Sequence, residues 1–252
     1  MTTYVYAIAR AEDLNLPEGL TGIGEPARPV RVLRREDLAA VVAEAPEGVR
    51  PKRRDLMAHQ RVVDAAASNG PVLPMRFGSI ADDDGAVDKV LDERAAHWRE
   101  RLSALEGRAE YNLKAAHRTD AVIHRVLAEE QEIRAVSDAQ RAAGGGTHED
   151  KLQLGEMVAG AVNERERRDA ELVRRALEGC AEAVQSGPSS RAWIADLSFL
   201  LTPESAGRFL RAVDELGRDQ PHLELTVNGP LPPYSFVEPD AESAPESAGS
   251  TV

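Results

Sequence analysis

The chain has 252 residues, of which 42% are hydrophobic and only 4% aromatic, so it is long enough for one large or two ordinary domains with mainly aliphatic cores. Its 31 basic and 43 acidic residues give a net charge of −12, which disfavours nucleic-acid binding. The longest stretch without Asp, Glu, Lys or Arg, residues 225–237, contains prolines and is too short to cross a membrane as a helix. The single cysteine, Cys180, rules out an intrachain disulfide and favours a reducing compartment, and no basic-then-apolar leader opens the sequence.

Residues 1–105 predict an N-terminal α+β domain, a sheet with two helices. Apolar residues in strand-like patterns indicate strands over residues 4–8, 29–33, 38–43 and 72–77. Helices are expected over residues 52–69 and 82–107, the second because apolar residues recur at helical spacing from Val87 to Leu105.

Residues 106–236 predict a C-terminal α+β domain with a long helical insertion. Strands are expected over residues 108–115, 193–201 and 223–227, and a helix over 203–217 whose start is marked by Thr202 and Pro203. Helices from Thr119 and over 149–184, joined by the glycine-rich residues 142–147, would form a hairpin arm over about 119–185. We therefore expect a small sheet covered by helices, for which a ferredoxin-like arrangement is one candidate.

Residues 237–252 contain four acidic and no basic side chains and are otherwise mostly Ser, Ala, Pro and Gly. Such a composition cannot bury enough apolar surface to offset the entropy cost of folding. We expect a disordered acidic tail.

Two segments rich in proline and glycine stand out, residues 70–78 and 229–236. Three of the ten aromatic side chains lie in them: Phe77, Tyr234 and Phe236. Because proline fixes φ and lacks a backbone donor, these segments predict stiff, extended surfaces rather than helix or central strand. They hold no nucleophile, base or metal ligand, and this favours contact with a partner over chemistry.

The segments Gly70–Gly78 and Gly229–Phe236 resemble motifs of the gas vesicle protein F/L family. Three further segments share the resemblance and follow in the family's order: Tyr4–Ile8, Met57–Val63 and Leu105–Glu110. It runs from about residue 3 to residue 236. The resemblance implies a cytoplasmic, gas-vesicle-associated bacterial accessory protein that binds the small hydrophobic shell protein, and other gas vesicle proteins, during assembly.

Eight residues of the two proline-rich segments are candidate partner-binding residues. They are Leu73, Met75, Arg76, Phe77, Pro232, Pro233, Tyr234 and Phe236. Arg76 either points to solvent from an alternating strand or anchors a carboxylate of a partner or of the other domain. The segment 232–236 either packs the chain end back onto the protein or forms a preorganised docking surface. The seam of the helical arm is a further candidate surface for an amphipathic helix of the shell protein.

Three patterns typical of catalytic, cofactor or metal sites are better explained by structure. The glycines of residues 22–27 are followed by a proline and an expected strand, which favours a loop over a dinucleotide site. His117, Asp120 and His124 lack a fourth metal ligand and are expected on a solvated helix face. Asp55 and His59 have no partnered nucleophile, so we expect them to form a surface or intersubunit hydrogen bond.

We therefore expect a non-enzymatic interaction protein with no cofactor or metal, no nucleic-acid partner and no membrane association. The alternative is an enzyme or a small-ligand-binding regulatory protein with a site between the two domains, which would require a deep cleft with convergent polar groups. The sequence leaves the oligomeric state open.

Overall fold

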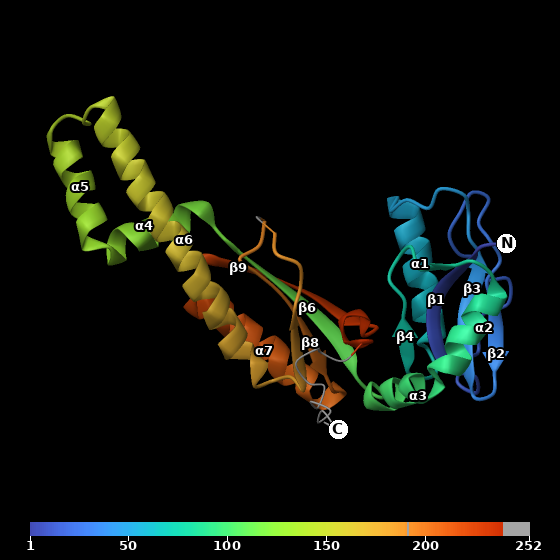
Figure 1. Ribbon diagram of the computed structural model, residues 1–252. Helices are drawn as coiled ribbons and strands as arrows, with labels where there is room; N and C mark the ends of the chain where they lie inside the picture. Colours follow the sequence, from blue (N-terminus) through green and yellow to red (C-terminus); the bar gives the residue numbers. More distant parts are fainter. Residues whose placement is uncertain (191, 239–252) are drawn as a thin grey trace, which may run out of the picture. The chain divides into compact units, whose positions relative to one another are not determined.

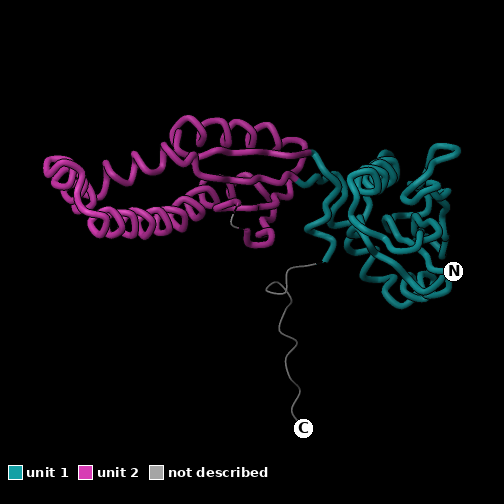
Figure 2. Tube along the Cα trace, turned by 90° about the horizontal axis from the view of Figure 1, so that it is seen from above, with its two compact units in different colours: residues 1–110, 230–252 teal, residues 111–229 magenta. Residues whose placement is uncertain are grey.

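The computed structural model describes residues 1–190 and 192–238 and contains two compact units, coloured separately in Figure 2. Unit 1 comprises residues 1–110 together with the segment from residue 230 onward, and unit 2 comprises residues 111–229. The expected boundaries at residues 105 and 236 differ from this division because residues 230–238 pack into unit 1. Of the expected tail, residues 239–252 lie outside the described part, whereas Val237 is buried.

Unit 1 is a sheet with three helices. Its elements are β1 (Thr3–Arg10), β2 (Arg31–Arg35), β3 (Leu38–Glu44), α1 (Arg53–Ala66), β4 (Val72–Pro74), β5 (Ile80–Ala81), α2 (Asp84–Glu93), α3 (Ala95–Ala104) and the 3₁₀ turn η1 (Tyr234–Phe236). The strand order is β2-β3-β1-β4, with β5 also paired to β1, and all of these pairs are antiparallel.

The core of unit 1 forms where α1 covers one face of this sheet (Figure 1). Tyr4 and Tyr6 of β1 are fully buried there and face Val62 and Val63 of α1. The alternation of side chains along β1 places both tyrosines on the same face of the sheet. Helix α2 packs on β2 and β3, and α3 packs on β1 and β4.

Two details of unit 1 differ from the sequence-based expectations. The helix expected over residues 82–107 is two helices, because the backbone of Arg94 leaves helical geometry between α2 and α3. The strand expected over 72–77 ends at Pro74, and a turn follows in which Gly78 has φ +91°.

Unit 2 is a four-stranded sheet with helices. Its elements are β6 (Ala109–His117), which begins in unit 1, α4 (Thr119–Glu129), α5 (Gln131–Ala142), α6 (His148–Glu178), β7 (Ala183–Ser186), β8 (Ala195–Leu201), α7 (Pro203–Asp219) and β9 (Leu223–Leu231), which ends in unit 1. The strand order is β7-β8-β6-β9. The sheet is antiparallel, so the expectation of an α+β protein is confirmed. The succession strand, helices, strand, strand, helix, strand is the order found in ferredoxin-like folds.

The helical arm consists of α4, α5 and α6, residues 119–178. In Figures 1 and 2, α5 and the N-terminal half of α6 extend beyond the sheet of unit 2. Gly144, Gly145 and Gly146 all have positive φ in the turn that joins the two helices, as the expected break requires. Thr147 and Asp150 then form a reciprocal capping box that starts α6.

The long helix ends earlier than expected. It was predicted to continue to residue 184, but α6 stops at Glu178 and residues 183–186 form β7 on the edge of the sheet. The apolar residues Cys180 and Val184 continued the helical spacing, and a short edge strand has too few residues to show its own period. Among the described helices, none is long and apolar enough to span a bilayer.

Candidate functional site

The eight candidate partner-binding residues all lie in unit 1. Arg76 is exposed, while Leu73, Pro233 and Phe236 are buried. Met75, Phe77, Pro232 and Tyr234 are half-buried. The structure therefore brings the two segments into one unit, and it uses Leu73 and Phe236 as core residues of that unit.

A groove of about 630 Å³ lies between the two proline-rich segments. One wall comes from the end of α1 and the residues that follow it, and another from residues 105–109 and 230–233. The lining residues include Ala67, Gly70, Pro71, Val72, Leu105, Pro230, Leu231, Pro232 and Pro233, with Asp64 on α1. We call this the proline groove. Both segments picked out in the sequence contribute to its lining.

A cluster of aromatic rings fixes the segment 75–78. The hydroxyl of Tyr4 accepts a hydrogen bond from the Gly78 amide at 3.0 Å and lies 3.0 Å from Nδ1 of His59. The other ring nitrogen of His59, Nε2, lies 3.1 Å from the carbonyl oxygen of Met75, so it must carry the proton and donate it. Nδ1 then accepts from the Tyr4 hydroxyl. Phe77 contacts the rings of Tyr4 and His59 edge-on.

Burial sets the charge of these rings. It raises the pKa of Tyr4 and the pKa of Tyr6 to about 12, and it lowers the pKa of His59, so all three are neutral near pH 7. The prediction that His59 forms a surface or intersubunit bond with Asp55 is wrong. His59 is a core residue, and Asp55 instead accepts a hydrogen bond from the Gly24 amide at 3.1 Å.

Hydrogen bonds hold the C-terminal segment of unit 1 in place. The buried carboxylate of Glu110 accepts from the amide and from the hydroxyl of Ser235, both at 2.8 Å. Arg101 donates to the carbonyl oxygens of Phe236 and Val237, and the Tyr234 hydroxyl donates to Gln60. These contacts favour the simpler interpretation of this segment, in which it packs back onto the protein and thereby shapes one wall of the proline groove.

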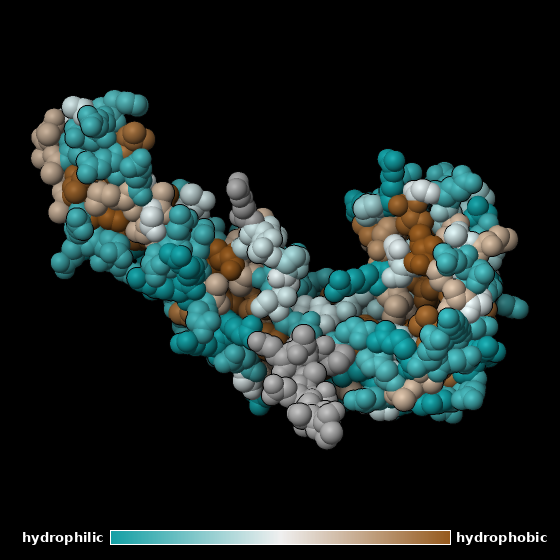
Figure 3. All heavy atoms as spheres, in the orientation of Figure 1, coloured by the Kyte–Doolittle hydropathy of each residue, from teal (hydrophilic) through white to brown (hydrophobic). Residues whose placement is uncertain are grey.

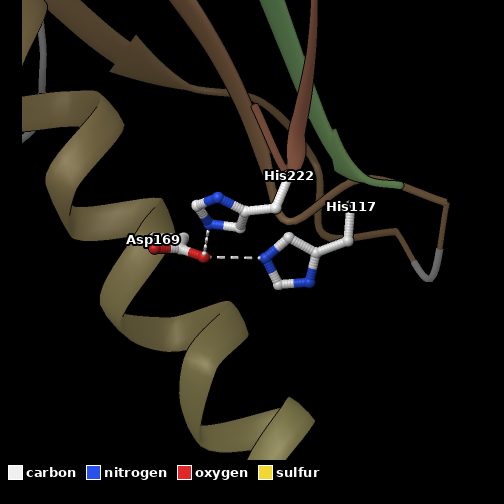
Figure 4. Close-up of side chains that lie close together, drawn as sticks. All are labelled: His117, Asp169 and His222. Atoms are coloured by element: carbon white, nitrogen blue, oxygen red, sulfur yellow. Dashed lines mark hydrogen bonds and ion pairs between the residues drawn. The ribbon is translucent and has the colours of Figure 1, made fainter. Parts of the chain in front are cut away.

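A second cluster, in unit 2, joins His117, Asp169 and His222 (Figure 4). His117 ends β6, Asp169 lies in the C-terminal half of α6, and His222 precedes β9. Both imidazole rings point toward Oδ2 of Asp169, with Nε2 of His117 at 2.9 Å and Nε2 of His222 at 2.7 Å. The side chains of all three are buried.

Two arginines complete this cluster. Arg165 donates from Nε to both carboxylate oxygens of Asp169, at 3.0 and 2.9 Å. Arg125 of α4 lies 3.2 Å from Nδ1 of His222. Burial alone would raise the pKa of Asp169, but hydrogen bonds from His117, Arg165 and His222 and the charge of Arg165 outweigh it, so the pKa is far below its usual range.

The proton positions favour a hydrogen-bonded network over a metal site. An arginine only donates, so Nδ1 of His222 must accept from Arg125 and the ring proton sits on Nε2, facing Asp169. A metal needs a free lone pair on that same Nε2. The guanidinium of Arg165 also lies against the carboxylate that would have to bind the cation. The arrangement ties the base of the arm to the sheet through two histidines and one carboxylate.

Patterns in the sequence reveal only part of this cluster. The prediction that His117 lies with Asp120 and His124 on a solvated helix face is wrong for His117, which is buried and bonds to Asp169 on another element. Asp169 stood at the end of a run of polar residues, 163–169, that interrupted the expected apolar seam. That run was the available signal for a buried polar contact, whereas nothing in the sequence marked His222.

Comparison with known proteins identifies the family. The model of the family described as "Gas vesicle synthesis protein GvpL/GvpF" matches residues 2–238, and the chain belongs to this family. Gas vesicle protein F of Streptomyces sp. (strain CB03234) is 57% identical to it over 238 residues, covering 94% of this chain and all of that protein. Gas vesicle protein L of the same strain is 29% identical over 258 residues, covering 93% of this chain and 92% of that protein. The resemblance inferred from the sequence motifs is confirmed.

Solved structures show the same fold. The crystal structure of GvpF from Anabaena sp. PCC7120 aligns with a TM-score of 0.72 at 22% identity, covering 94% of this chain and 98% of that one. GvpF from Microcystis aeruginosa aligns with a TM-score of 0.68 at 20% identity, covering 94% and 99%. Membership of the family implies a role in gas vesicle formation.

Proposed function

We propose that this protein is a non-catalytic accessory of gas vesicle assembly, located in the cytoplasm and on the forming vesicle. It binds the small hydrophobic shell protein and other gas vesicle proteins, and it covers their apolar surface until they join the shell. The proline groove carries this proposal. Proline-rich walls are already stiff, so a partner that enters the groove loses little of its binding energy to ordering them.

The arm offers a second apolar surface for the same role. Leu152 on α6 is 58% exposed, and in Figure 3 hydrophobic side chains reach the surface along the arm as well as on unit 1. An amphipathic helix of the shell protein would lay its apolar face against such a surface. The groove and the arm therefore supply two contact regions, one in each unit.

Co-expression with the shell protein tests the proposal. The wild-type chain should co-purify with it, and a charge placed in the groove, Ala67→Glu or Leu231→Glu, should reduce the recovered shell protein by about tenfold or more, since a carboxylate in an apolar contact must be desolvated. Leu210→Glu on α7 is the matched control, because Leu210 is 42% exposed, belongs to unit 2 and is not a lining residue of the groove. Failure of the wild-type chain to retain any shell protein would remove the proposal.

A further inference from the structure

The outward face of α1 combines apolar and cationic side chains. Met57 is 55% exposed. Two arginines, Arg53 and Arg54, lie four and three residues before Met57, and Arg61 lies four residues after it. This spacing makes helical side chains neighbours. Leu56, 41% exposed, lies beside it. An exposed methionine surrounded by arginines has the composition of a protein-binding centre, where Met and Arg are enriched relative to other surfaces.

The charges of Arg53 and Arg61 on this face are not neutralised by ion pairs within the described part of the protein, whereas that of Arg54 is. Across residues 1–190 and 192–238, no ion pair involves Lys52, Arg53 or Arg61 within 4.0 Å. Arg54 pairs with Glu25 and Asp55. The one carboxylate on the outward face of the helix, Asp64, instead accepts a hydrogen bond from Gln60 at 2.7 Å. A positive surface thus persists on a protein whose net charge is −12.

The same face leads directly to the proline groove. Asp64 and Ala67, further along α1, line the groove. Gln60 lies between the two regions, because it donates to Asp64 and accepts from the hydroxyl of Tyr234. A partner seated in the groove can therefore continue along α1.

We propose that the α1 patch, formed by Lys52, Arg53, Arg54, Leu56, Met57 and Arg61, binds an acidic segment of a protein partner that places an apolar side chain on Met57. This inference rests on the proposed function and names the chemistry of the partner at the surface next to the groove. The carboxylates of the segment pair with the arginines, which form stronger hydrogen bonds to carboxylates than neutral donors do. The apolar side chain removes Met57 and Leu56 from water.

A narrow peptide segment fits this patch better than nucleic acid or a membrane. Charges in solution are screened beyond about 8 Å at physiological ionic strength, so a short acidic segment meets mainly the local cations. A nucleic acid or an anionic bilayer would also face the acidic surface that gives the chain its overall charge of −12. A nucleic acid would in addition offer no aliphatic side chain to Met57.

Fluorescence anisotropy with labelled peptides tests the proposal on the full chain. The probe is a short synthetic helical peptide of Glu, Ala and Leu. Its controls are the same peptide with Gln in place of Glu and a version with Ala in place of Leu. We expect both controls to bind about tenfold more weakly, and we expect high salt to weaken binding of the acidic peptide. Arg53→Gln combined with Arg61→Gln, and separately Met57→Ala, should each weaken binding by about tenfold, or about 1.4 kcal/mol.

The matched control is the exposed face of α7. Leu210 is exposed there, with Arg208 and Arg211 close to it in the sequence. No arginine lies three or four residues from Leu210, however, so the helical neighbours of this leucine are not cationic. Leu210→Ala, and Arg208→Gln with Arg211→Gln, should leave peptide binding unchanged. Equal binding of the acidic and neutral peptides would overturn the proposal. An equal loss of peptide affinity in the α7 variants would also overturn it. So would a DNA oligonucleotide or anionic vesicles that bind more tightly than the acidic peptide, if the α1 substitutions abolish that binding.

The outcome separates this inference from the proposed function. If the α1 variants still retain the shell protein, or any other gas vesicle protein co-expressed with the chain, while the groove variants do not, the proposed function stands and the acidic-segment proposal falls. If the acidic peptide binds to the chain but no gas vesicle protein does, the acidic-segment proposal stands and the proposed function falls.

Discussion

His222 donates a hydrogen bond from Nε2 to Oδ2 of Asp169 at 2.7 Å, and neither side chain is more than 2% exposed. The two residues are separated by 53 positions and belong to α6 and to the loop before β9. Arg165 and Glu129 add a contact between α6 and α4 at 2.6 Å. Polar contacts therefore join the base of the arm to the sheet, in addition to the buried apolar residues of α4 and α6.

Replacing the shared carboxylate should destabilise unit 2 strongly. Asp169→Asn removes the charge that His117, His222 and Arg165 all face, and it turns an amide toward donors that need an acceptor. Breaking a buried charged network in this way costs roughly 3–5 kcal/mol. Urea unfolding followed by circular dichroism measures it, with the exposed Asp138→Asn as control. A loss of less than about 1 kcal/mol would show that the network does not hold the fold together.

Stability should also fall as the pH drops below neutrality. Burial lowers the pKa of His222, and the positive charges of Arg125 and Arg165 lower it further, against the opposing effect of Asp169. As the pH falls, His222 of the unfolded chain therefore takes up a proton near pH 6.5, where His222 of the folded chain is still unprotonated. The unfolded state is favoured as the pH falls through that value toward the folded pKa, so stability rises with pH across this window.

The variant His222→Gln isolates this effect. A glutamine can donate to Asp169 and accept from Arg125 but does not titrate. Its unfolding midpoint should vary less between pH 5 and pH 7.5 than that of the wild-type protein. His59, whose pKa burial also lowers, contributes in the same direction and remains in both proteins. The exposed His124→Gln serves as control, and an unchanged pH dependence in His222→Gln would contradict the prediction.

Local signals in the sequence predicted much of the fold, and contacts between distant residues supplied the rest. Thr202 and Pro203 start α7 as expected, because a capping residue acts on its own helix turn. The break at Arg94 and the edge strand β7 carry no such local marker. The network of His117, Asp169 and His222 joins residues more than fifty positions apart, so spacing along the chain cannot reveal it. The proline groove could be anticipated only as two separate stiff segments.

Gly22 should not tolerate a side chain. A Cβ at this position would lie 1.9 Å from the Tyr6 hydroxyl, which is buried and accepts a hydrogen bond from the Ile23 amide at 2.9 Å. Forcing extra volume into a packed core costs roughly 1–3 kcal/mol or more, so Gly22→Ala should lower the thermal midpoint. Gly155→Ala in α6 is the control, since a Cβ there meets nothing within 4 Å and should stabilise the helix. Equal midpoints for the two variants would refute the close contact with Tyr6.

The hydroxyl of Tyr4 should stabilise the segment that follows β4. Tyr4→Phe keeps the ring but leaves Nδ1 of His59 and the amide of Gly78 without this partner. An unsatisfied buried polar group costs roughly 1–3 kcal/mol, and we expect faster amide exchange at Gly78 in addition. Tyr111→Phe, at a ring that packs on Phe209, is the comparison. Unchanged exchange at Gly78 in Tyr4→Phe would mean that the hydroxyl does not fix this turn.

The Glu110 carboxylate should control the wall of the proline groove formed by the C-terminal segment. Glu110 is 4% exposed and accepts from the amide and the hydroxyl of Ser235, so Glu110→Ala removes both acceptors while the helices of unit 1 keep their packing. Residues 232–238 should then exchange their amide hydrogens faster. Because Pro232 and Pro233 line the groove, the variant should also retain less shell protein. Glu238→Gln weakens the pairs of this exposed side chain with Arg94 and His97 but leaves the contacts between Glu110 and Ser235 intact, so it should change neither measurement. Faster exchange with undiminished binding would show that the wall need not be held in place for a partner to bind.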